Sequence, residues 1–327
     1  MSILTIGDIH CQLKNFNIID QLQNQILSLI KKNKYKFIVL LGDLLHNHEK
    51  IHTLELNKII SFIHSLSQNI KIFILVGNHD MISNQEHLSD NNWMYFFKLF
   101  NINNVIIVNK PIKFEEYLFV PYVYPGKFIE TLNNEIDNWK NSKIIFAHQE
   151  LNGSKYGNIT SSKEKWDESF PLIISGHIHD KQYVQPNLFY SGIPFTHNFG
   201  DKLDNIILEI NQNNEIKEIL TNLPFKKNLY FDFKDIELFE KNIKEYKDDE
   251  NQYKFIIKGN ENDLIFFREK YKHYFNIKNI KILCKINMLS ESNLNKKIDN
   301  ILKYNDLIKE NISKENIKIQ RLYEKLE

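Results

Sequence analysis

The chain has few of the residues that cross-link small secreted proteins or interrupt regular structure. Its 327 residues include 2 cysteines, 10 glycines and 7 prolines, against 15 tyrosines and 23 phenylalanines. Cys11 and Cys284 lie far apart in the sequence and fit no CxxC spacing, so neither a disulfide framework nor a cysteine zinc site is indicated. The composition also excludes collagen-like, disordered and low-complexity chains. We expect a folded protein in a reducing, intracellular setting.

The sequence also lacks long apolar runs and an excess of charge of one sign. The N-terminus leads into Gly7-Asp8 without a basic region, and no segment is apolar enough to cross a bilayer. We therefore expect neither a signal peptide nor a membrane anchor. With 42 basic and 41 acidic side chains, the net charge is +1. This balance does not identify a nucleic-acid-binding protein, but it leaves room for a basic groove.

Short apolar runs alternate with amphipathic stretches through the first half of the chain, which predicts β-α-β units and a mixed α/β fold. Buried strands are expected at residues 3–6, 37–41 and 72–76. Each is followed by glycine and then by Asp or Asn. Shorter connections then predict a second sheet, with strands at residues 144–147, 172–175, 188–190 and 206–210. We expect this first domain to cover residues 1–224.

The remainder of the chain has a different pattern. A strand, helix, strand, helix, strand order predicts a small α/β domain over residues 225–290. Residues 291–327 are rich in lysine and asparagine, with apolar residues at helical spacing, and predict two amphipathic helices. Such helices fit packing on their own core and binding to a partner equally well.

Five short blocks of polar residues stand where predicted strands stop. They are Gly7-Asp8-Ile9-His10, Gly42-Asp43-Leu44-Leu45-His46, Gly77-Asn78-His79-Asp80, Ala147-His148 and Gly176-His177-Ile178-His179. Ligands of open α/β sheets collect at the carboxyl ends of the strands. We therefore expect the five blocks to converge on one crevice.

The spacing inside the blocks indicates metal binding. Residues i and i+2 of extended chain point to the same side, so Asp8 and His10 are expected to share an ion, as are His177 and His179. The adjacent pair Asn78-His79 would point in two directions, one toward metal and one toward substrate. Carboxylate, amide and imidazole donors without thiolate suit Mn²⁺, Fe²⁺ or Zn²⁺. Seven donors are too many for one tetrahedral ion and fit two ions with a shared ligand.

The ordered blocks resemble the calcineurin-like metallophosphoesterase superfamily, whose pattern is Asp-x-His, Gly-Asp, Gly-Asn-His-Asp, His and Gly-His-x-His. The resemblance implies a four-layer sandwich of two mixed β-sheets flanked by helices, and two divalent ions, with Mn²⁺ expected first and Fe²⁺ or Zn²⁺ as alternatives. It assigns Asp8, His10 and His179 to one ion, Asn78, His148 and His177 to the other, and Asp43 to both. His79 would be the acid that acts on the leaving group or a stabiliser of the transition state, and His46 would assist from the other side of the phosphate.

Further motifs are similar to SbcD-type recombination and repair nucleases, including phage recombination endonuclease subunits. They are His46, the block from His148 to Gly153, and the block from Tyr190 to Phe195. That resemblance implies an exonuclease and endonuclease acting on DNA, a small α/β capping domain, and C-terminal helices that bind an SbcC-type coiled-coil ATPase. One feature departs from the SbcD-type nucleases: Cys11-Gln12 follow Asp-x-His. The protein phosphatases have an arginine beside their second motif, whereas this sequence has no arginine near any motif.

Alternative interpretations remain open. A phosphoesterase for a small nucleotide or another phosphodiester, or an assembly protein with weak chemistry, would share these motifs. Whether a homodimer forms is also open.

Asp80 and Asp180 are expected to orient neighbouring residues, and His197 to face the cleft or belong to a turn. Five other histidines are expected at the surface: His48, His52, His64, His87 and His273.

Overall fold

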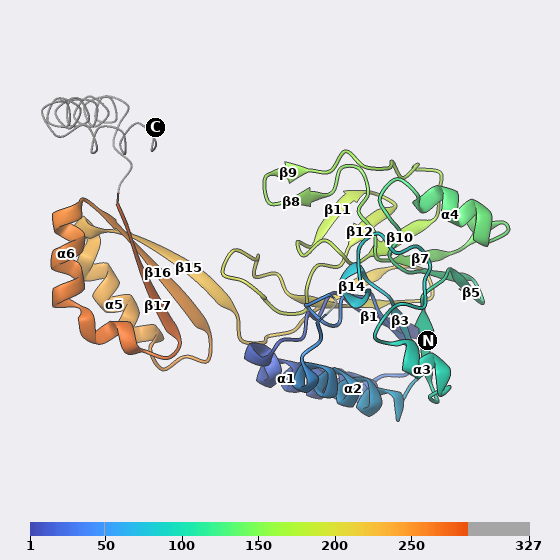
Figure 1. Cartoon of the computed structure of the whole chain (residues 1–327), viewed down its shortest axis with the longest axis horizontal. Helices are drawn as coiled ribbons and strands as arrows, with labels where there is room; N and C mark the ends of the chain where they lie inside the picture. Colours follow the sequence, from blue (N-terminus) through green and yellow to red (C-terminus); the bar gives the residue numbers. More distant parts are fainter. Residues whose placement is uncertain (49, 287–327) are drawn as a thin grey trace, which may run out of the picture. The chain divides into compact units, whose positions relative to one another are not determined.

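The computed structural model describes residues 1–48 and 50–286, which fall into two units (Figure 1). Unit 1 comprises Met1–Asn228 with Asp248–Lys254, and unit 2 comprises Leu229–Lys247 with, among the described residues, 255–286. The predicted domain limits at residues 224 and 290 stay predictions. The predicted C-terminal helices over residues 291–327 lie outside the described residues. No helix in the described part of the chain has the length and apolar character needed to cross a membrane.

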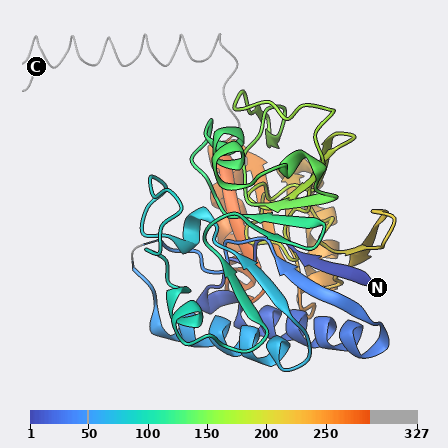
Figure 2. The same ribbon diagram turned by 90° about the vertical axis from the view of Figure 1, so that its right-hand side faces the viewer.

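Unit 1 contains a first six-stranded sheet in the order β14-β13-β1-β2-β3-β4. Four neighbouring strands are parallel: β1 (Ser2–Ile6), β2 (Tyr35–Leu40), β3 (Ile72–Leu75) and β4 (Val105–Val108). The other two are antiparallel: β13 (Ile206–Ile210) and β14 (Ile216–Leu220). Strand β13 was expected in the second sheet, and that expectation is wrong because β13 pairs with β1. Helices α1 (Phe16–Lys32) and α2 (Thr53–Ser67) lie side by side along one face of this sheet (Figures 1 and 2). The apolar side chains of both helices pack against the sheet and bury that face.

A second six-stranded sheet has the order β11-β12-β10-β7-β6-β5. Its parallel strands are β6 (Tyr117–Val120), β7 (Ile144–Ala147), β10 (Leu172–Ser175) and β12 (Leu188–Tyr190). Its antiparallel edge strands are β5 (Ile112–Phe114) and β11 (Gln182–Gln185). Helix α4 (Phe128–Glu135) packs on its outer face. The short helix α3 (Tyr95–Leu99) precedes β4, and β8 (Lys155–Tyr156) pairs with β9 (Ile159–Thr160) as a hairpin.

The two sheets face each other across an apolar layer. Phe37 and Phe73 of the first sheet pack with Phe119 and Phe146 of the second, and the rings of Phe73 and Phe119 stack with centroids 4.1 Å apart. A strand that is covered on both faces has a continuous run of apolar residues. Strands β3 and β7 are buried at every residue, which explains why both were predicted from their apolar runs. The predicted sandwich of two mixed sheets flanked by helices is confirmed.

Most of a three-stranded sheet in the order β15-β16-β17 belongs to unit 2, and the first residues of β15 and β16 belong to unit 1. The elements along this part of the chain follow the predicted alternation: β15 (Lys226–Asp232), α5 (Ile236–Tyr246), β16 (Gln252–Gly259), α6 (Glu261–Lys270) and β17 (Ile280–Ile286). Phe239 of α5 and Phe267 of α6 are fully buried, with ring centroids 5.1 Å apart. The aromatic residues of this part of the sequence therefore form a core of their own.

Candidate metal centre

The predicted ligands follow five strands of both sheets: β1, β2 and β3 of the first sheet and β7 and β10 of the second. Six of them form two groups whose donor atoms lie within 4.8 Å of one another: Asp8, His10 and His179 in one, and Asp43, His148 and His177 in the other. The expected convergence of distant blocks therefore occurs. The assignment of each residue as a metal ligand stays a prediction.

The first group has two imidazoles and one carboxylate. His10 Nε2 lies 3.1 Å from His179 Nε2. Asp8 is fully buried, and its Oδ2 accepts a hydrogen bond from the backbone N–H of His177 at 2.9 Å. Its Oδ1 is buried without a hydrogen-bond partner. Because buried oxygens are nearly always satisfied, this one is suited to coordinate a cation.

The second group is completed by an amide oxygen. Asn78 Oδ1 lies 3.0 Å from His148 Nε2 and 2.8 Å from His177 Nδ1. His148 Nδ1 donates to the carbonyl oxygen of Leu41 at 2.7 Å. That bond fixes the ring and turns its Nε2 lone pair toward the centre of the group, as the outer hydrogen bond of a metal-binding histidine does.

Asp43 lies between the two groups. Its Oδ2 is 3.6 Å from His10 Nε2 and 3.4 Å from His148 Nε2. Its Oδ1 accepts a hydrogen bond from the backbone N–H of His79 at 2.8 Å. A carboxylate in this position can contact an ion in each group, which is the geometry that the sequence interpretation required.

The backbone around the donors is unusual. His10, Asp43 and His177 have φ values of 45°, 51° and 75°, in the left-handed region that non-glycine residues rarely adopt. Gly77 permits the close packing, because a Cβ there would stand 2.2 Å from Asp43 Oδ1. Such conformations cluster at functional sites, where the surrounding structure holds them.

One expectation about spacing is wrong. The i, i+2 argument placed His177 and His179 on one ion, yet their ring nitrogens belong to different groups. The argument assumed extended chain, and the positive φ of His177 breaks that geometry. The assignment of these two histidines to separate ions, which came from the family resemblance, agrees with their positions.

Burial and charged neighbours together set the electrostatics of the donors. Burial raises the pKa of Asp8 well above its usual value and lowers the pKa of His10 well below its usual value. Burial also lowers the pKa of His177 to about 3. Burial opposes charge on His148 too, but the carboxylates of Asp43 and Asp8 outweigh it and raise the pKa of that ring to about 9. The uncharged imidazoles of His10 and His177 are donors that Mn²⁺, Fe²⁺ and Zn²⁺ accept, whereas His148 holds a proton near neutral pH that a bound ion would displace. Carboxylate, amide and imidazole donors without thiolate fit these divalent ions.

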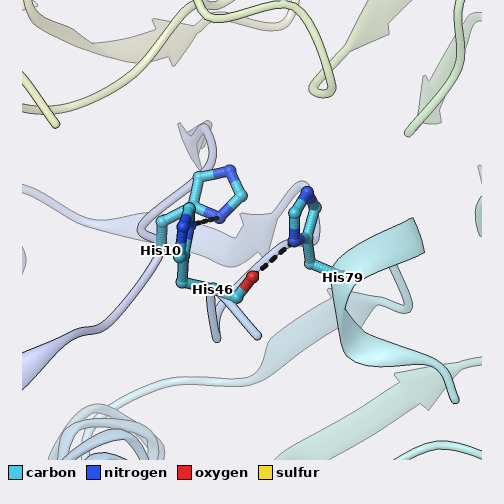
Figure 3. A group of neighbouring side chains, drawn as sticks. All are labelled: His10, His46 and His79. Carbon is cyan, nitrogen blue, oxygen red and sulfur yellow. Dashed lines mark hydrogen bonds between the residues drawn. The ribbon is translucent and has the colours of Figure 1, made fainter. Parts of the chain in front are cut away.

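A third group consists of His10, His46 and His79 (Figure 3). His46 Nδ1 lies 3.4 Å from His10 Nδ1, and His79 Nδ1 donates to the carbonyl oxygen of His46 at 2.5 Å. His48 was expected at the surface, but it is half-buried and its ring stacks on that of His79 with centroids 4.3 Å apart. That expectation is wrong because the loop after β2 folds back over His79.

Two further residues form hydrogen bonds with the backbone of the segments that carry the donors. Asp80 orients loops as predicted: its Oδ1 accepts the backbone N–H of Leu44 at 3.1 Å, and its Oδ2 accepts that of Gly77 at 3.1 Å. His197 lies in a bend, where it is buried behind His10 and does not line the cleft. It is 3% exposed, its Nε2 donates to the carbonyl oxygen of Asp8 at 3.1 Å, and its ring centroid is 5.1 Å from that of His10. No sequence motif marks His197.

A cavity of about 350 Å³ opens beside the donors, and Asp43, Asn78, His79 and His177 line it. The aromatic side of this cavity was not predicted from the sequence. Tyr156, in the β8–β9 hairpin, also lines this cavity, and its ring centroid is 6.1 Å from that of His177. Nothing in the local sequence of that hairpin indicates its position at the site. We call this space the metal cavity.

Comparisons with known proteins agree with this geometry. Residues 1–181 match the family described as calcineurin-like phosphoesterase. A protein of Invertebrate iridescent virus 3, provisionally named phosphoesterase 078R, is 36% identical over 269 residues, which cover 79% of this chain and 76% of the relative. The provisionally named phosphoesterase 244L of Invertebrate iridescent virus 6 is 46% identical over 211 residues, which cover 63% of this chain and 74% of the relative.

Among solved structures, the nuclease MPE of Pseudomonas putida is similar at 13% sequence identity and a TM-score of 0.34. The alignment covers 66% of this chain and 87% of that one. A similarity of this size supports no conclusion about substrate.

Proposed function

Because the chain belongs to the calcineurin-like phosphoesterase family and is therefore a phosphoester hydrolase, we propose that it hydrolyses phosphodiester bonds of DNA. The observation that carries the proposal is the position of Asp43 between two groups of nitrogen and oxygen donors. Two such groups with one carboxylate between them suit a pair of divalent ions at one phosphate.

We propose that Asp8, His10 and His179 hold one ion, that Asn78, His148 and His177 hold the other, and that Asp43 contacts both. Mn²⁺ is the ion we propose, with Fe²⁺ or Zn²⁺ as alternatives. Divalent ions at such a site make bound water more acidic and neutralise phosphate oxygens. The protein contributes fixed donors, since the outer hydrogen bonds of Asp8 and His148 hold them in place.

His79 is proposed to protonate the leaving oxygen. Its Nδ1 is engaged by the carbonyl oxygen of His46, and its backbone N–H by Asp43 Oδ1, so the ring has a fixed direction. Its Nε2 is then the nitrogen left to exchange a proton with substrate. His46 is proposed to assist, because its ring approaches both His10 and His79. General acid catalysis of this kind contributes about 10² to 10⁴ in rate.

The choice of DNA rests on the motifs around His46, His148 and Tyr190, and on the small strand and helix unit that follows the phosphoesterase body. The same similarity supports an SbcC-type coiled-coil ATPase as partner, an intracellular location and a role in recombination and repair. The proposed partner-binding segment, residues 291–327, lies outside the described residues. A homodimer stays an untested prediction.

Cleavage assays with the full-length chain test the substrate. Purified protein with Mn²⁺ is given linear duplex DNA, single-stranded DNA and bis(p-nitrophenyl) phosphate. We expect DNA to be degraded, and the activity to disappear with a chelator and to return when Mn²⁺ is added back. Hydrolysis of the small phosphodiester with no cleavage of either DNA would overturn the DNA proposal in favour of a small nucleotide or other phosphodiester.

A further inference from the structure

A second cavity adjoins His79. It has a volume of about 310 Å³, within the range of ligand pockets, and none of the seven predicted ligands lines it. Among the described residues that line the two cavities, His79 alone lines both this one and the metal cavity. We call the second cavity the flanking pocket, and the residues used in the argument are His48, Ile51, His79, Ile82, Trp93 and Tyr95.

The flanking pocket combines aromatic and apolar side chains with three asparagines and two carboxylates, which belong to Asn47, Asn91, Asn92, Asp80 and Asp90. Ile51, Ile82 and Tyr95 line it although 39%, 47% and 40% of their surfaces are exposed. Trp93 is fixed by a hydrogen bond from its Nε1 to Asp80 Oδ1 at 2.8 Å. Rigid aromatic faces beside aliphatic side chains are suited to a flat ring system, on which nucleic-acid-binding proteins commonly stack a base.

The charges around the pocket do not suit a phosphate. No lysine or arginine is among the described residues that line it. The Asp90 carboxylate is engaged by Lys98 Nζ at 2.9 Å and by Asn109 Nδ2 at 2.7 Å. Asp80 is engaged by backbone N–H groups, as described above. An uncharged planar group therefore fits this pocket, while an anionic phosphate fits the metal cavity.

We propose that the flanking pocket receives the nucleobase of the nucleoside that leaves when the phosphodiester is cleaved. This inference rests on the proposed function, in which His79 protonates the leaving oxygen. Since His79 lies at both cavities, the leaving nucleoside extends from the phosphate past His79 into the flanking pocket. The substrate would then be chosen partly by an aromatic base on its leaving side.

The test uses a dinucleoside monophosphate and two analogues, each lacking one of the two bases. We expect removal of the base on the leaving side to lower kcat/KM about 10-fold, the size of one stacking contact, and removal of the other base to have a smaller effect. Tyr95→Ala should lower kcat/KM on the intact dinucleotide by a similar factor and have little effect on the analogue without the leaving base. Tyr183→Ala is the control, because Tyr183 is 59% exposed on edge strand β11 and does not line the pocket.

Equal kcat/KM values for all three substrates in the wild type would overturn the inference while the phosphodiesterase proposal stands. A second measurement needs no turnover: saturation-transfer NMR with deoxyadenosine, with deoxyribose as the sugar control. Transfer to the base protons in the wild type that is lost in Tyr95→Ala, but kept in Tyr183→Ala, supports the inference even if DNA is not cleaved. Equal transfer in all three proteins overturns it.

Discussion

The two units bury different kinds of side chain. In the described residues, every buried polar or charged side chain belongs to unit 1, and many of these surround Asp8, Asp43 and His148. The buried side chains described for unit 2 are aromatic or aliphatic. Left-handed non-glycine residues occur in unit 1, whereas the described part of unit 2 has none. Buried charge and strained backbone oppose folding, so unit 1 contains features that bound ions would help to offset, while unit 2 is stabilised by ordinary packing.

Asp43→Ala should give the largest effect. Removing the carboxylate between the two donor groups should abolish binding of at least one ion and lower phosphoesterase activity on the order of 10³-fold, since ions contribute several kcal/mol of charge stabilisation. Elemental analysis after dialysis against Mn²⁺ and steady-state kinetics measure both effects.

Asp20→Ala is the matched control for this variant. Asp20 is exposed on α1 and pairs with Lys58, so its loss should leave the metal content and the activity unchanged. If Asp43→Ala keeps two ions and full activity, metal binding and turnover in unit 1 do not need this carboxylate. The difference between the two units would then not be explained by metal binding at Asp43.

His79→Asn should separate metal binding from turnover within unit 1. The variant should keep both ions, because His79 belongs to neither of the two groups around Asp43. Its turnover should fall by about 10² to 10⁴, the contribution of a general acid. Metal content and kcat are measured on the same preparation. Equal metal loss in His79→Asn and Asp43→Ala would contradict the separate roles of these residues.

Much of the fold was predictable from apolar runs. Strands β7, β10, β12 and β13 have the predicted limits, because strands covered on both faces are continuously apolar. Strand β6 was not predicted although its four residues are buried. The edge strands β4, β5, β11 and β14 were not predicted either. The burial of the last three alternates or is partial, so polar residues interrupt the apolar signal, and their pairing depends on neighbours distant in sequence.

The site was predictable where short motifs stand at strand ends. The positions of Asp8, Asp43 and Asn78 follow from that rule. The contribution of His48, His197 and Tyr156 could not be predicted, because each reaches the site through a loop or hairpin whose path is set by tertiary packing. The wrong pairing of His177 with His179 has a related cause: a positive φ at a histidine leaves no mark in the sequence.

Phe239→Ala should show that unit 2 depends on packing alone. Phe239 is fully buried, with ring centroids 5.1 Å from Phe267 and 5.6 Å from Phe255. We expect the free energy of unfolding of unit 2 to fall by about 3 to 5 kcal/mol. Mn²⁺ stoichiometry should not change, since no residue of the candidate metal centre belongs to unit 2. Urea denaturation followed by far-UV circular dichroism, together with elemental analysis, measures both.

The control for that variant is Phe266→Ala, on the same helix. Phe266 is 54% exposed, so its removal should change the free energy of unfolding by no more than about 0.5 kcal/mol. A loss of bound Mn²⁺ in Phe239→Ala, with normal content in Phe266→Ala, would show that the two units are coupled and would weaken the contrast between them.

Asn260→Ala should give the smallest effect, confined to one helix of unit 2. Asn260 caps α6, where its Oδ1 accepts the backbone N–H of Asp263 at 2.9 Å and the Asp263 side chain bonds back to the Asn260 N–H. Loss of this cap should cost about 1 kcal/mol. Hydrogen exchange should quicken in the first turn of α6, while Asn242→Ala, inside α5, leaves α6 unchanged. If the Asn260 variant instead quickens exchange around Asp43, unit 2 helps to hold the metal centre, and its stability cannot be assigned to packing within unit 2 alone.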